Sequence, residues 1–455
     1  MNTDPRDIIS RSPMSALQIL VVAITVGLNA LDGFDVLAIS FASPGIAQEW
    51  GIDRAVLGFL VSMELVGMAI GSLVLGPFAD RIGRRPLTLG CLVLMAVGMF
   101  LAASAHGIYD LSAYRILTGL GIGGVLAAIN AIAAEFSNAR RRHLCVSIMA
   151  IGYPIGAVLG GKFVQHLLLD HTWRSIFYFG SICTTAFIPL VFFFVPESVH
   201  WLARKQPNQA LEKINRIMTR LGHTVVNALP ALTAEVRKRS VKDLFAPALI
   251  TTTILVAVAY FFHIMTFYYV LKWTPKIVVD MGFTQSSAAG VLVWANVGGA
   301  LGGAVLGLLT QRYSVKALTI GAMILSTVMV AIYGHAPADL QKLSLMCAVA
   351  GFFTNGAIVG MYAIFAQVFP THVRAGGTGF GIGVGRGGSF VGPSAAGLLF
   401  NGGVSVPVVS MILALGSLFG AVVVSFIKVR SDDASADAAE DKDGVPMRSA
   451  SASSS

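Results

Sequence analysis

Twelve stretches of the chain are apolar for long enough to cross a lipid bilayer, and this pattern restricts the fold more than any other feature. A membrane-spanning helix needs about 20 apolar residues. The stretches cover residues 16–41, 55–77, 87–105, 109–136, 144–168, 173–195, 247–272, 286–310, 316–334, 342–369, 377–401 and 404–428. Only 12% of the residues are charged, against about a quarter in soluble domains. The sequence therefore predicts an all-α membrane protein with twelve transmembrane helices.

The spans form two groups of six on either side of a polar segment. This pattern predicts an N-terminal half (1–195), a central cytoplasmic loop (196–246), a C-terminal half (247–428) and a tail (429–455). The loop contains "NQALEKINRIMTRLG", in which apolar residues recur at helical spacing between basic ones, so a helix along the membrane surface is expected. The tail is rich in Ser, Ala and Asp, which predicts disorder.

The basic residues are distributed unequally between the two sides of the membrane. Of the 32 Lys and Arg residues, 24 lie on the side of both termini and the central loop, and six lie on the other. The positive-inside rule therefore predicts cytoplasmic termini, and it accounts for the net charge of +9 without a nucleic-acid partner. The four cysteines lack CxxC spacing and clustered histidines, so we expect no disulfide framework, metal or cofactor.

The second half of the chain repeats the first at an offset of 231 or 232 residues. Glycines and arginines recur at this offset, as in Gly76 and Gly307, Arg81 and Arg312, Gly119 and Gly351, and Gly156 and Gly388. Parallel six-helix repeats are the plan of major facilitator transporters, whose substrate site lies between the halves near the middle of the membrane. The repeat therefore predicts that fold, with two pseudo-symmetric six-helix halves.

The loop after the second span, "GPFADRIGRR", matches the major facilitator loop signature G-x-x-x-D-R-x-G-R-R. The match holds at every fixed position, namely Gly76, Asp80, Arg81, Gly83, Arg84 and Arg85. Two glycines permit a tight turn, and an acid beside several bases can form an ion-pair latch that holds the halves in one state. Alternatively, the arginines only enforce orientation. The second copy, "GLLTQRYSVK", has Gln311 in place of the aspartate, which predicts a weak second latch.

Two aspartates, Asp32 and Asp35, lie inside the first span in the stretch "LDGFD". Residues three apart project within about 60° of each other on a helix, so the two acids can share one cavity. Two carboxylates in a low dielectric are not expected to stay ionised together, so at least one is predicted to load and release a proton. The alternative is a pair of helix-end acids that point into water.

Four further ionisable residues lie inside spans, where such residues mark transport pathways or structural pairs. Arg386, in "GIGVGRGGSFVGP", can receive a substrate carboxylate bidentately, or it can pair with an acid of the first span. Arg115 can communicate with the proton site or the substrate, or form a structural pair. Glu64 and His263 are candidates for the transport path, although a histidine bonded to a neighbouring helix fits the sequence equally well.

Four stretches resemble the aromatic acid:proton symporter family within the major facilitator superfamily. They are "LDGFD", "QEWGIDRAVLG", "GYPIGAVLGGKF" and "GIGVGRGGSFVGP". The similarity runs through nearly all twelve spans, and the D-G-x-D pattern is its most specific part, since its acids are held necessary for transport in that family. The resemblance implies that Asp32 and Asp35 are the proton-linked pair and that Arg386 is a partner for the substrate carboxylate.

The resemblance implies a transporter that imports an aromatic carboxylate, such as a hydroxylated benzoate, with protons by alternating access across a bacterial inner membrane. We expect the transporter to be monomeric. Three alternatives remain open at this point: a proton-antiporting exporter of drugs or organic anions, an importer of an aliphatic acid or sugar, and a membrane sensor without net flux. An enzyme is not expected, because the sequence offers no set of nucleophile, base and oxyanion donors and no metal cluster.

Overall fold

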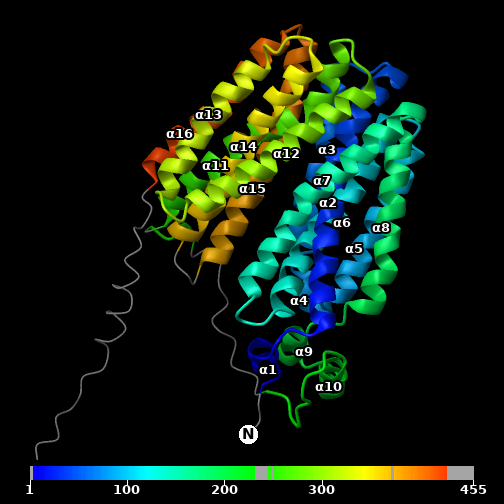
Figure 1. The fold of residues 1–455 in the computed structure, drawn as a ribbon, viewed down its shortest axis with the longest axis vertical. Helices are drawn as coiled ribbons and strands as arrows, with labels where there is room; N and C mark the ends of the chain where they lie inside the picture. The colour runs from blue at the N-terminus through cyan, green and yellow to red at the C-terminus, as the bar shows by residue number, and fades with distance from the viewer. Residues whose placement is uncertain (1–3, 231–243, 248, 370–372, 428–455) are drawn as a thin grey trace, which may run out of the picture.

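The computed structural model describes residues 4–230, 244–247, 249–369 and 373–427, and within these ranges all regular secondary structure is helical (Figure 1). Eleven helices are long and apolar enough to cross a membrane. They are α2 (Ala16–Trp50), α3 (Arg54–Val74), α5 (Arg84–Ala103), α6 (Ile108–Glu135), α7 (Arg142–Asp170), α8 (Arg174–Phe194), α11 (Ile250–Asp280), α12 (Gln285–Leu309), α13 (Val315–Tyr333), α14 (Leu340–Val368) and α16 (Val406–Phe426). The glycine-rich α15 (Arg374–Asn401) is the twelfth long helix. The predicted fold class is confirmed.

Two helices extend beyond the predicted spans. The first was expected to end at residue 41 and the seventh at 272, but α2 continues through Pro44 and α11 through Pro275. A proline lacks the N–H that would bond to the carbonyl four residues earlier. In α2 that carbonyl belongs to Ser40, and it accepts a 2.9 Å hydrogen bond from the Ser43 hydroxyl instead. A side chain thus replaces the missing backbone donor and lets the helix continue.

Within each half, glycines bring pairs of helices into close contact, and the pairs are equivalent in the two halves. In the first half α2 packs on α7 and α3 on α6, and in the second α11 packs on α15 and α12 on α14. A Cβ on Gly156 would lie 1.8 Å from the carbonyl oxygen of Ala30, and one on Gly302 would lie 1.9 Å from that of Phe352. Helices in lipid associate largely through such close packing of small residues. The glycines of "GYPIGAVLGG" therefore join α7 to α2.

The two halves meet at one end of the bundle. We call the end that holds α1 (Pro5–Arg11), α9 (Val199–Lys205), α10 (Ala210–Arg220) and the end of α16 the termini side, and the opposite end the far side. The ribbons of the halves converge toward the far side and diverge toward the termini side (Figure 1). Contacts that join the halves near the far side include Arg54 to Asp280 at 2.9 Å between Nη2 and Oδ2, and Ser286 Oγ to the Gln165 carbonyl at 2.7 Å.

The helix expected in the central loop is present as α10. Its apolar face contacts protein, because Ile214, Ile217 and Met218 are buried in a cluster with Trp201 and the termini-side ends of the first-half helices. The helix is thus docked on the first half rather than free to lie on lipid. The predicted tail, 429–455, and part of the central loop, 231–243, lie outside the described residues.

Candidate functional site

A buried ion pair lies in the middle of the first half. Nη2 of Arg115, on α6, is 2.5 Å from Oε1 of Glu64, on α3, and both side chains are fully buried. The same nitrogen donates a 2.9 Å hydrogen bond to the backbone carbonyl of Asp35 on α2. A buried charge is tolerated only when it is paired and hydrogen-bonded. Both residues were predicted to bind substrate, but each is the other's partner, which favours the structural-pair alternative.

Lys272, on α11, adds a second cation to this pair from the other half of the protein. Its Nζ lies 3.6 Å from Oε2 of Glu64 and also donates a hydrogen bond to the carbonyl oxygen of Val36. The Lys272 side chain is fully buried. Lys272 was not among the predicted site residues, because the seventh span was expected to end there. The signal that identifies it is the short apolar run "IVV" at 277–279, which continues the helix after Pro275.

Asp35 lies beside this network without a hydrogen-bond partner. Its side chain is fully buried, and among the described residues neither carboxylate oxygen has a donor. Arg115, Glu64 and Asp32 are close enough to interact with it electrostatically. An ionised carboxylate that lacks hydrogen bonds is costly to bury. This position therefore suits an acid that can take up and release a proton.

Asp32 is also buried, but it interacts with the second half. Its side chain is 3% exposed, its Oδ1 has no hydrogen-bond partner in the described part of the chain, and Arg386 of α15 is within electrostatic range. Arg386 is half-buried, and its guanidinium makes no ion pair with any described carboxylate. The two charges therefore influence each other without a direct ion pair, which leaves the guanidinium open to a ligand.

Four tyrosines from three helices lie within electrostatic range of Asp32, of Arg386 or of one another. They are Tyr153 on α7, Tyr260 and Tyr268 on α11, and Tyr362 on α14. The hydroxyl oxygens of Tyr260 and Tyr362 are 3.1 Å apart, and Tyr268 is within electrostatic range of both Arg386 and Asp32. Aromatic rings with polar tips can flank a flat, partly polar ligand. Tyr153 belongs to the stretch "GYPIGAVLGGKF" but was not singled out, and Tyr362 carries no distinctive sequence signal, because only the tertiary fold brings it here.

His263 does not belong to this site. Its Nδ1 lies 2.9 Å from the Ser417 hydroxyl and its Nε2 lies 2.9 Å from the Thr354 carbonyl, and the side chain is fully buried within the second half. Both ring nitrogens are therefore used in joining α11 to α16 and α14. The structure favours this structural role over the predicted contact with substrate.

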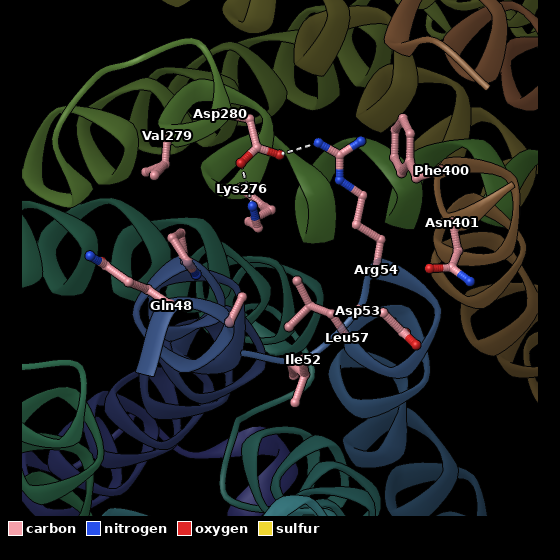
Figure 2. Close-up of a pocket in the computed structure, with 12 residues that line it drawn as sticks. Gln48, Ile52, Asp53, Arg54, Leu57, Lys276, Val279, Asp280, Phe400 and Asn401 are labelled. Carbon is pink, nitrogen blue, oxygen red and sulfur yellow. Dashed lines mark hydrogen bonds and ion pairs between the residues drawn. The ribbon is translucent and has the colours of Figure 1, made fainter. Parts of the chain in front are cut away.

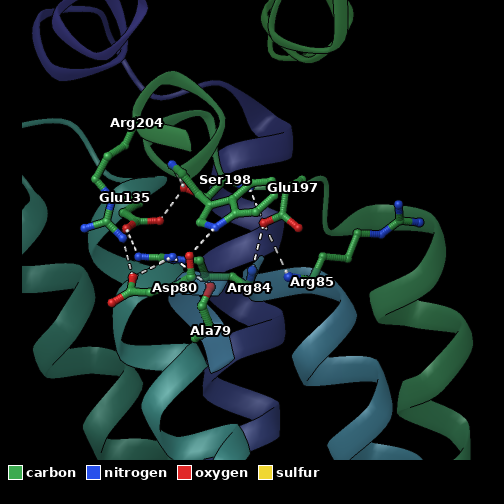
Figure 3. A network of polar contacts seen from close by, with 9 residues as sticks. Ala79, Asp80, Arg84, Arg85, Glu135, Glu197, Ser198 and Arg204 are labelled. Carbon is green, nitrogen blue, oxygen red and sulfur yellow. Dashed lines mark hydrogen bonds and ion pairs between the residues drawn. The ribbon is translucent and has the colours of Figure 1, made fainter. Parts of the chain in front are cut away.

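The loop signature forms a polar network on the termini side (Figure 3). Arg84 pairs with Asp80 at 3.0 Å, between Nη1 and Oδ1, and with Glu135 at 3.2 Å, between Nη2 and Oε1. Asp80 Oδ1 also lies 2.5 Å from Nη2 of Arg204 on α9. Burial opposes ionisation of Asp80, but the hydrogen bonds and charges of Arg204 and Arg84 outweigh it and hold the pKa of this carboxyl below its usual value.

This network lies within the first half and the central loop. Gly83 has a φ of 106°, and a Cβ there would lie 2.3 Å from a carboxylate oxygen of Glu197, so the turn requires glycine. Arg81 lies over the ring of Phe78, and Arg85 lies over that of Phe192. Among the described residues, no ion pair of the signature reaches the second half. A latch between the halves therefore stays a prediction.

A pocket of about 580 Å³ lies on the far side, where α2, α3, α11 and α15 meet (Figure 2). Arg54 of the first half pairs there with Asp280 of the second, and Asp280 also pairs with Lys276 on its own helix. The Arg54 guanidinium lies 5.6 Å from the centre of the Phe400 ring. Arg54, Lys276 and Asp280 thus form ion pairs where the halves touch. None of the residues that line this pocket belongs to the central site.

Comparison with known proteins identifies relatives along almost the whole chain. The gallate transporter of Pseudomonas putida is 28% identical over 424 residues, which cover 92% of this chain and 94% of that protein. The 4-hydroxybenzoate transporter PcaK of Acinetobacter baylyi is 29% identical over 433 residues, covering 93% and 94%. The 3-(3-hydroxy-phenyl)propionate transporter of Escherichia coli is 29% identical over 426 residues, covering 92% and 97%.

Solved structures and a family model agree on the fold. The inward open conformation of the xylose transporter XylE from E. coli has a TM-score of 0.70 at 17% identity, covering 91% of this chain and 97% of that one. The model of the Major Facilitator Superfamily matches residues 25–345 and 280–453, which together include most of the chain. The members of this family are transporters rather than enzymes. The chain therefore belongs to the Major Facilitator Superfamily.

Proposed function

We propose that this protein imports an aromatic carboxylate together with protons across a bacterial inner membrane. The three relatives described above are named for gallate, 4-hydroxybenzoate and 3-(3-hydroxy-phenyl)propionate, each of which carries an aromatic ring and a carboxylate. The excess of basic residues on the termini side supports an orientation in which both termini are cytoplasmic. The protein acts as a monomer in this proposal, since each chain carries both halves of the site.

The observation that carries the proposal is the guanidinium of Arg386, which is half-buried near Asp32 and has no ion-pair partner among the described residues. A guanidinium binds a carboxylate through two parallel hydrogen bonds, with more geometric specificity than a lysine. The tyrosines near Arg386 supply ring faces and hydroxyls for a hydroxylated aromatic ring. On α11 and α14, Tyr268 and Tyr362 are more exposed than Tyr260. The bound acid thus has its carboxylate on Arg386 and its ring among the tyrosines.

Asp32 links this binding step to a proton. When the substrate carboxylate reaches Arg386, two carboxylates compete for one cation in a low-dielectric site, and protonation of Asp32 removes the repulsion. A monoanion that moves with one proton carries no net charge. A second proton, on Asp35, makes transport sensitive to the membrane potential by about 2.3 kcal/mol per charge per 100 mV.

Binding measurements on the purified protein test the site. We expect saturable binding of at least one of the three acids named above, and no competition by xylose. Arg386→Lys keeps the charge but loses the bidentate geometry. The lost hydrogen bond is worth about 1 kcal/mol or more, so Kd is expected to rise at least about fivefold. Arg216→Lys, on the exposed face of α10, is the matched control and should leave Kd unchanged. Equal affinities of the Arg386→Lys variant and the wild type would contradict the assigned role of Arg386.

A further inference from the structure

Lys272 is a buried charge that the proposed function leaves unused. It belongs to the second half, but both of its polar partners, the Glu64 carboxylate and the Val36 carbonyl, belong to the first. Its neighbours hold this part of α11 in the second half: Trp273 Nε1 donates a 2.9 Å hydrogen bond to the Pro393 carbonyl of α15. Major facilitator halves rock against each other around the central site. The contact of Lys272 with Glu64 therefore requires the halves to be together on the far side.

The charges around Asp35 balance differently with and without Lys272. With Lys272 in place, Arg115 and Lys272 supply two positive charges and Glu64 one negative charge. The group is then neutral when Asp35 is ionised and carries one positive charge when Asp35 is protonated. Without Lys272, the group is neutral only when Asp35 is protonated. Uncompensated charge is costly in a low-dielectric interior, so each arrangement favours its neutral form.

The other ionisable groups that face this part of α2 do not reverse this balance. Asp32 is on the same helix, Tyr153 is on α7 and Cys183 is on α8, so all three stay with the first half. The helix α12, which also packs on α2, has no ionisable side chain. Arg386 moves with the second half, but it interacts electrostatically with Asp32 and not with Asp35. Lys272 is thus the cation that the second half contributes to the Arg115–Glu64 pair beside Asp35, and its place there depends on the state of the far side.

We propose that Lys272 is a positioning residue that switches Asp35 between its protonated and ionised forms as the halves move. When the far side opens, Lys272 withdraws and Asp35 takes up a proton. When the far side closes, Lys272 inserts beside Glu64 and Asp35 releases the proton toward the termini side. This inference rests on the proposed function for its direction, because import requires proton loading from the far side. The charge balance itself does not depend on which acid is carried.

Distance measurements between spin labels test the switch without substrate. Labels at Tyr109 and Lys342, which are exposed at the far-side ends of α6 and α14, report the state of the far side after the four native cysteines are replaced. One linked proton changes an equilibrium by up to about tenfold per pH unit. We therefore expect the ratio of closed to open far side to rise with pH in the wild type. The same rise is expected in Lys272→Arg, and a flat response is expected in Lys272→Met and in Asp35→Asn.

Lys276→Met is the matched control, because Lys276 lies one turn further along α11 and pairs with Asp280 instead of Glu64. It should keep the pH response of the wild type. Lys272→Gln also removes the charge and serves as a second neutral variant if Lys272→Met does not fold. A wild-type pH response in both neutral Lys272 variants would overturn the proposal, and so would a flat response in Lys272→Arg. Failure of the cargo proposal appears instead as absent substrate binding with the pH response intact.

Discussion

Substitution of Glu64 by Gln removes a carboxylate that lies between two buried cations. The carboxylate oxygens are 2.5 Å from Nη2 of Arg115 and 3.6 Å from Nζ of Lys272, and all three side chains are fully buried. Removing one partner of a buried ion pair costs about 3–5 kcal/mol, because the remaining charge is left uncompensated. The amide of Gln still accepts one hydrogen bond, so we expect a loss near the lower limit, about 3 kcal/mol.

The free energy of unfolding can be measured by titrating the protein with sodium dodecyl sulfate in mixed micelles and following helical circular dichroism. Glu212→Gln is the matched control, since its partner Arg216 is 3.1 Å away but the two side chains are 64% and 76% exposed. An exposed pair of this spacing is worth about 0.3–0.5 kcal/mol. If Glu64→Gln cost no more than Glu212→Gln, the buried pair would not exist as described.

A double substitution gives a test with a definite sign. Glu64→Gln leaves Arg115 and Lys272 both uncompensated, whereas Glu64→Gln combined with Lys272→Met leaves only Arg115. The double variant is therefore expected to be more stable than Glu64→Gln alone, with a coupling energy of about 0.5–3 kcal/mol. A double variant whose losses simply add would show that Lys272 and Glu64 do not interact.

Four other substitutions test three separate parts of the structure. Gly156→Ala should cost about 1–3 kcal/mol in the same assay, because its Cβ would lie 1.8 Å from the Ala30 carbonyl oxygen. Gly321→Ala, with no atom within 4 Å, should instead stabilise by about 0.4–1 kcal/mol, and equal effects would argue against close packing of α2 on α7. Asp53 Oδ1 accepts a 2.7 Å hydrogen bond from the Val56 N–H, so Asp53→Ala should lower the free energy of unfolding by about 0.5–2 kcal/mol. It should also speed hydrogen exchange in the first turn of α3, and unchanged exchange would exclude the cap. Asp80→Asn should lower the free energy of unfolding by less than about 1 kcal/mol, because the Asp80 side chain is 57% exposed. If the loop acts as a latch, the substitution should slow transport severalfold, and an unchanged transport rate would exclude the latch.

The spans were predictable because their length and apolar composition are set by the bilayer rather than by tertiary contacts. The largest errors in the span boundaries were at residues 41 and 272, because α2 continues through Pro44 and α11 through Pro275. In α2 the Ser43 hydroxyl supplies the hydrogen bond that Pro44 cannot, and such local compensation is not visible in composition alone. Ending the seventh span at residue 272 placed Lys272 at the edge of the membrane, so a cation that contacts Glu64 was not considered as a site residue.

The acidic pair shows a different limit of sequence reasoning. Asp32 and Asp35 were predicted to share one face of a helix and one cavity, and both are buried on α2. Because α2 lies between the halves, however, a small angular separation gives the acids different neighbours: Asp32 interacts with Arg386 of the second half, and Asp35 with Arg115 of the first. Spacing along a helix predicts which residues share a face, but the partners depend on how other helices pack around it.

Proton-coupled import is tested most directly by measuring substrate accumulation and internal pH together in sealed vesicles that contain the purified protein. Labelled 4-hydroxybenzoate, gallate and 3-(3-hydroxyphenyl)propionate are supplied outside at a pH below the internal pH. We expect at least one acid to accumulate beyond its equilibrium level, with a matching internal acidification. Asp32→Asn should still exchange internal for external substrate but should not accumulate it. Failure of all three acids to accumulate, or accumulation that survives collapse of the pH gradient by a protonophore, would contradict proton-coupled import.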